Sequence, residues 1–63
     1  MTEYAIKVRK QGEKRWLFLG CGGTMNHLRV HALRFQTKER AFETIEQNAP
    51  NNPDYDWKAV VLK

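Results

Sequence analysis

Apolar and polar residues alternate in the first and last segments of the chain, with the period of two that is typical of strands with one buried face. Residues 4–9 and 55–62 follow this pattern, and residues 15–19 form a short run rich in aromatic and large apolar side chains. Residues 28–35 also read as a strand, although their alternation slips between Ala32 and Leu33, which indicates a bulge or kink. The pattern therefore predicts four strands.

A helical period replaces this alternation after residue 36. Thr37 is a suitable N-cap, because its hydroxyl can accept a backbone N–H of the first turn, and Glu39 suits the positive end of the helix dipole. Pro50 should end the helix near Asn48, since proline disfavours helical geometry in the residue before it. The apolar stripe of this helix consists of Ala41, Phe42, Ile45 and Ala49.

This order predicts a single small α+β domain over residues 1–63, with the topology β-β-β-α-β. Three hairpin-linked strands form an antiparallel meander, although the second loop, residues 20–27, is long for a hairpin, and the helix packs on one face of the meander. A right-handed crossover should then add the C-terminal strand beside the first strand and parallel to it.

The pleat of the sheet assigns each side chain to one of two faces, and a slip of one residue would invert the assignment for that strand. The face beneath Phe42 and Ile45 should carry Tyr4, Ile6, Val8, Leu17, Leu19, Leu33, Phe35, Trp57, Ala59 and Val61. The open face should carry Lys7, Arg9, Lys14, Trp16, Phe18, Arg34, Lys58 and Val60.

Charge is distributed unevenly along the chain. The 63 residues include 11 Lys and Arg and 7 Asp and Glu, for a net charge of +4. Residues 1–40 hold nine basic and three acidic side chains, whereas residues 41–63 hold two basic and four acidic ones. A clustered basic surface attracts phosphates through a term that weakens with salt.

The basic side chains and the aromatic rings of the open face together form the candidate binding site. Aromatic rings on a sheet stack with unpaired bases, at about 1–3 kcal/mol per base, while Lys and Arg neutralise phosphates. A basic three-stranded sheet can instead enter the major groove of duplex DNA. The candidate contacts are Lys7, Arg9, Lys14, Trp16, Phe18 and Arg34.

A protein partner is the alternative for the same surface. Trp16 and Phe18 with nearby Val and Leu residues resemble an apolar protein-binding patch, which would suit an accessory or inhibitor protein of a phage or mobile element. Homodimerisation through this face or through an unpaired edge strand is a further form of this alternative.

Catalysis, metals and cofactors are not expected. The segment 19–23, Leu-Gly-Cys-Gly-Gly, resembles the glycine motif of S-adenosylmethionine-dependent methyltransferases, but the chain is too short for the sheet that such a site needs. Cys21, His27 and His31 lack a fourth zinc ligand and a nearby carboxylate for nucleophilic catalysis. Asp54 and Asp56 are better explained as residues of a solvated turn.

Two features indicate the cellular setting. No apolar run is longer than four residues, the length of 16–19, whereas a membrane-spanning helix needs about 20. The single cysteine, Cys21, cannot form an internal disulfide, and the first residues do not resemble a secretion signal. We therefore expect a cytoplasmic protein without membrane contact.

Residues 32–41, Ala-Leu-Arg-Phe-Gln-Thr-Lys-Glu-Arg-Ala, resemble the strand-to-helix corner of the arm-binding domains of phage integrases and of the plant ethylene-response DNA-binding domains. The resemblance implies a three-stranded sheet backed by a helix that reads DNA through Arg, Lys and Trp on the sheet. It assigns no individual base contact to this chain. The sequence is also similar to small phage and prophage proteins that end with a strand after the helix.

Overall fold

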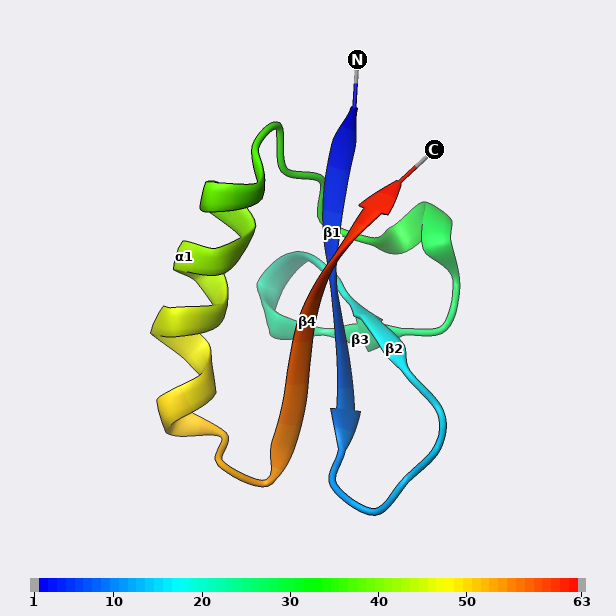
Figure 1. The fold of residues 1–63 in the computed structure, drawn as a ribbon. Coiled ribbons are helices and arrows are strands. Elements are labelled where there is room, and N and C mark those ends of the chain that lie inside the picture. Colours follow the sequence, from blue (N-terminus) through cyan, green and yellow to red (C-terminus); the bar gives the residue numbers. More distant parts are fainter. Residues whose placement is uncertain (1, 63) are drawn as a thin grey trace.

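The computed structural model describes residues 2–62, which form a four-stranded antiparallel sheet with one helix on one of its sides (Figure 1). The strand order across the sheet is β3-β2-β1-β4. The fold is therefore α+β, as expected, and the last strand lies beside the first. The strands and the α-helix are β1 (Glu3–Lys10), β2 (Leu17–Leu19), β3 (Met25–Asn26), α1 (Lys38–Asn48) and β4 (Tyr55–Leu62).

The regular patterns of the sequence correspond to the long elements. β1 and β4 occupy the two alternating segments, and they pair along eight residues of each strand. Thr37 caps α1, because its side-chain oxygen accepts a hydrogen bond from the Arg40 backbone N–H at 3.2 Å. A single turn of 3-10 helix, Ala49–Asn51, contains Pro50 and ends the helical segment.

The core lies between the sheet and α1. Ile6, Val8, Leu19 and Ala41 are buried and in mutual contact. Most of the other side chains expected beneath the helix pack against these four residues, but Val61 and Phe42 are 51% and 46% exposed. Both differ from expectation because Ala41 and Ile45, rather than Phe42, face the sheet, and because Val61 lies near the end of an edge strand.

The predicted third strand over residues 28–35 is wrong. The two residues of β3 pair with β2 instead, and the chain then turns at once, with the Asn26 side chain accepting a hydrogen bond from the Leu28 N–H at 2.8 Å. A 3-10 turn, η2 (Arg29–His31), follows, and the chain returns through isolated bridges, first from Ala32 to Gly20 and then from Phe35 to Tyr4 of β1.

The predicted direction of β4 is also wrong, because β4 runs antiparallel to β1. The turn after β3 adds one reversal, so that Phe35 meets Tyr4 at the start of β1. α1 then leads toward the far end of β1, where Tyr55 pairs with Lys10. β4 must therefore run back along β1 in the opposite direction.

The face of the sheet opposite α1 is only partly open. Figure 1 shows η2 on the side of the sheet away from α1. Arg29 of η2 lines a hollow together with Lys7, Phe18 and Val60. Ala5 belongs to this face and is fully buried. The accessible part of the open face therefore lies toward the end of β1.

Candidate nucleic-acid interface

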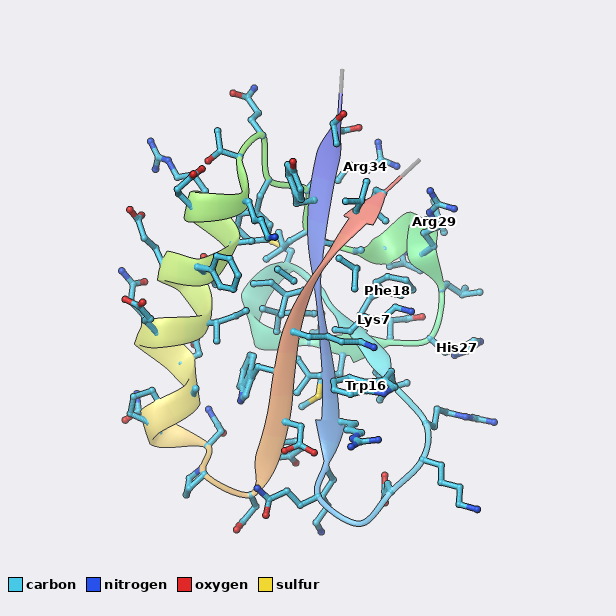
Figure 2. All side chains as sticks on the ribbon, viewed as in Figure 1. Lys7, Trp16, Phe18, His27, Arg29 and Arg34 are labelled. Carbon is cyan, nitrogen blue, oxygen red and sulfur yellow. The ribbon has the colours of Figure 1, made fainter. Side chains whose placement is uncertain are left out.

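Strand register brings the main candidate side chains to one side of the sheet. Phe18 lies opposite Lys7 across the β1–β2 pair, and the same register carried one residue further sets Trp16 opposite Arg9. Residues directly opposite in an antiparallel pair share a face. Figure 2 shows the side chains of Lys7, Trp16 and Phe18 directed away from α1. The expected placement of Arg9 and Trp16 on one face is thus confirmed.

Cationic groups lie over both aromatic rings of this face. The Arg9 guanidinium and the Lys58 ammonium lie 4.6 Å and 4.3 Å from the centroid of the Trp16 ring. The Lys7 ammonium lies 5.1 Å from the centroid of the Phe18 ring. These distances fall within the range of cation–π attraction. We call the set Lys7, Arg9, Trp16, Phe18 and Lys58 the cationic–aromatic cluster.

The cluster contains a pair of like charges. Lys7 and Lys58 are directly opposite each other on β1 and β4. Like charges in this position repel and destabilise the sheet. Each ammonium lies over a different ring, Phe18 for Lys7 and Trp16 for Lys58, which stabilises the two charges separately without neutralising either. An anion bound between them would remove the repulsion.

One carboxylate partly neutralises the positive charge of the cluster. Asp56 is the cross-strand partner of Arg9, and its Oδ2 accepts a hydrogen bond from Arg9 Nε at 3.1 Å. Both side chains are more than a third exposed, so this ion pair is worth less than about 1 kcal/mol. The contact fixes the guanidinium beside Trp16. It also gives Asp56 a structural role in place of the solvated turn position that the sequence indicates.

The remaining two candidates lie outside the cluster. Lys14 is exposed in the connection between β1 and β2, two residues before Trp16. Arg34 lies at the other end of β1, where its Nη1 is 3.9 Å from Glu3 Oε1 (Figure 2). Because Trp16 lies opposite the end of β1 and Glu3 is at its start, Arg34 does not join the cluster.

The structure adds residues that the sequence did not single out. Lys58 was expected on the open face but not as a contact, and Asp56 was assigned no part in the site. The positions of Lys58 opposite Lys7 and of Asp56 opposite Arg9 follow from the antiparallel register of β4. The expected parallel pairing would not place these residues opposite each other. Arg29 was assigned to a strand, whereas the structure places it on η2 at the rim of the open face.

The residues considered for metal or nucleophilic chemistry are dispersed at the surface. Cys21, His27 and His31 are exposed and lie on separate elements or connections. Within residues 2–62, no three His, Cys, Asp or Glu side chains come together in an arrangement that could hold a metal ion. The glycine-rich segment forms a tight turn that contains the 3-10 helix η1 (Cys21–Gly23), in which Gly22 and Gly23 have φ values of 71° and 79°.

Comparisons with known proteins add no relative. The chain matches no family model, no curated protein and no solved structure. Between residues 2 and 62, the structure has no helix with the length and apolar character needed to cross a bilayer. The cationic–aromatic cluster is therefore the feature of the chain that indicates a function.

Proposed function

We propose that this chain is a small binding module without catalytic activity, and that it binds nucleic acid through the cationic–aromatic cluster. The observation that carries the proposal is the opposed pair Lys7 and Lys58, each lying over an aromatic ring. A phosphate between the two ammonium groups would relieve their repulsion, and the rings beneath offer stacking surfaces to bases. A cytoplasmic setting belongs to the same proposal, and the unpaired thiol of Cys21 supports it.

Single-stranded nucleic acid fits this surface better than a duplex does. A sheet that enters the major groove must present a protruding face. Here η2 rises on the same side as the cluster and obstructs such an approach (Figure 1). A flexible single strand can follow the accessible half of the face, with phosphates near the cations and bases near Trp16 and Phe18.

The order of contacts follows from the layering of the cluster. Trp16 and Phe18 are half-buried, whereas Lys58 is exposed and lies over the Trp16 ring. An approaching strand therefore meets ammonium groups first. Stacking on the indole requires Lys58 or Arg9 to move aside toward a phosphate, which replaces a cation–π contact with a charge-assisted hydrogen bond.

The proposal is tested by titrating a fluorescently labelled single-stranded oligonucleotide at low salt. Trp16→Ala should weaken binding by about 1–3 kcal/mol, because it removes a stacking surface. Arg40→Ala is the control for attraction by net charge alone, since Arg40 is exposed on α1, on the other side of the sheet. Absence of binding by the parent chain, or equal effects of the two substitutions, would contradict the proposal.

A protein partner on the same side is the second candidate function. Val30 on η2 is 70% exposed, and Leu28 just before it is 45% exposed. Exposed aliphatic side chains beside a charged cluster are typical of a protein-binding surface. Val30→Lys should abolish a protein contact there and should leave oligonucleotide binding intact or stronger.

A further inference from the structure

The outer edge of β4 has the features of a self-association surface. β4 is eight residues long and ends the strand order, so that within residues 2–62 no strand covers its outer edge. Its sequence, Tyr-Asp-Trp-Lys-Ala-Val-Val-Leu, has no proline or glycine, and β1 and β4 pair without interruption. Long regular edge strands without such interruptions readily pair with another chain.

The backbone hydrogen bonds show which groups this edge presents. Both backbone groups of Tyr4 bond to Phe35, and Gln11 N–H donates to the Asp54 carbonyl. Successive residues of a strand direct these groups to alternate edges, so the odd-numbered residues of β1 bond to β4. Their partners in β4 are Asp56, Lys58, Val60 and Leu62. The intervening residues, of which Trp57, Ala59 and Val61 are central, therefore direct N–H and C=O outward.

Two exposed apolar side chains, Phe42 and Val61, lie on the β4 side of the molecule. Arg40, Thr44 and Gln47 of α1 line a hollow with Phe35, which is on the β2 side of β1. Phe42 is about 200° around the helix from Thr44, at about 100° per residue, and so faces the β4 side. Phe42 is 46% exposed, and Val61 on the helix-facing side of β4 is 51% exposed.

We infer that two copies of this chain pair through β4 in antiparallel fashion, with the two-fold axis at Ala59. This register sets Trp57 opposite Val61 of the second copy, and it uses the outward backbone groups of Trp57, Ala59 and Val61 in about six interchain hydrogen bonds. An axis at Lys58 would instead set two lysines directly opposite each other. The Ala59 register pairs Lys58 with Val60 of the second copy.

The packing of the helices allows this arrangement. α1 contacts both β1 and β4, so it lies above these two strands. In the paired sheet, the two helices would be about two strand spacings apart, or about 10 Å, which is a distance at which helices pack directly against each other. The helices would therefore meet above the paired β4 strands, where Phe42 and Val61 from each copy would be covered.

Dimerisation would also place two cationic–aromatic clusters on one surface, a consequence that rests on the proposed function. A two-fold axis perpendicular to the sheet keeps both open faces on the same side. The β2 strands, which adjoin Trp16, would be about five strand spacings apart, or about 24 Å. A single strand long enough to span this distance would then contact both clusters.

Sedimentation equilibrium without nucleic acid tests the dimer directly. We expect the mass to rise with concentration from 7.4 kDa toward twice that value. Ala59→Pro should keep the chain monomeric and folded, because the Ala59 N–H faces outward and bonds to nothing in β1. Val61→Lys should also prevent dimerisation, and Val30→Lys, on exposed η2, is the matched control that should leave the dimer intact.

The outcomes separate this inference from the proposed function. A parent chain that stays monomeric at all concentrations would overturn the inference, and so would a dimer that survives Val61→Lys. If Ala59→Pro fails to fold, Val61→Lys alone provides the test. A dimer that binds no oligonucleotide contradicts only the proposed function. If both hold, Val61→Lys should bind a short oligonucleotide like the parent and should lose the added affinity for a long one.

Discussion

At the scale of single residues, Trp16 shows how the candidate site depends on side-chain packing. Its indole lies beneath Arg9 of β1 and Lys58 of β4, although Trp16 itself lies just outside β2. Arg9 in turn is positioned by Asp56. A rigid ring loses little entropy when a base stacks on it. However, Arg9 or Lys58 must leave the face of the indole before a base can stack there.

Gly20 directly follows β2, and its substitution gives a first prediction. A Cβ at this position would lie 2.7 Å from Thr24 Oγ1 and 3.2 Å from the His31 carbonyl oxygen. Gly20→Ala should therefore lower the free energy of unfolding by about 1–3 kcal/mol, as overpacking does. Urea denaturation measures the change. Adding Thr24→Ala removes the closer contact and should restore part of the loss; no recovery would contradict the steric explanation.

At the scale of elements, the cap of α1 offers a second prediction. Thr37 Oγ1 accepts the Arg40 N–H, and Glu39 lies in the first turn. Thr37→Ala should lower the free energy of unfolding by about 1 kcal/mol, whereas Thr37→Ser should retain most of it. Chemical denaturation followed by circular dichroism checks both variants. Equal stability of Thr37→Ala and the parent would show that the cap contributes nothing.

The pairing of β1 with β4 gives a third prediction, in which stability and binding separate. Lys7 and Lys58 repel across the two strands. Lys7→Glu converts this pair to opposite charges, so the free energy of unfolding should stay the same or rise by up to about 1 kcal/mol. Oligonucleotide binding should weaken, because a phosphate would meet a carboxylate. A variant that is less stable but binds normally would contradict the proposed role of the pair.

The elements also show what the sequence could and could not predict. β1, α1 and β4 were predicted closely because each has an unbroken period and a clear cap or turn at its ends. Residues 28–35 alternate as a strand does, but the turn at Asn26 and the 3-10 helix η2 take their place. The alternation of apolar and polar residues favours extended backbone, but it does not specify which strand this backbone pairs with.

The same limit explains the errors in the candidate site. Lys7, Arg9, Trp16 and Phe18 were grouped correctly, because β1 and β2 are neighbours joined by a short connection. Asp56 and Lys58 were missed as members because their neighbours depend on the direction of β4, which depends on a single chain reversal after β3. The register between strands far apart in the chain is thus the property that the local sequence pattern specifies least.

At the scale of the whole molecule, charge is separated between the two sides of the sheet. On the open side, Lys7, Arg9 and Lys58 outweigh the single carboxylate of Asp56. On the other side, the acidic residues of α1 outnumber its basic ones, with Glu39, Glu43 and Glu46 against Lys38 and Arg40. An oligonucleotide should therefore be attracted preferentially to the open side. The net charge of +4 contributes a weaker attraction that has no preferred orientation.

Salt dependence measures this separation and gives the last prediction. For a single strand, each phosphate contact contributes about 0.7 to the slope of log affinity against log salt concentration. Lys58→Ala should lower the steepness of this slope by about 0.7, whereas Lys38→Ala, on α1, should leave it nearly unchanged. Asp56→Asn should strengthen binding at low salt, because it removes the carboxylate beside Arg9. If Lys58→Ala and Lys38→Ala changed the slope equally, attraction would follow net charge alone, and the oriented binding surface would be excluded.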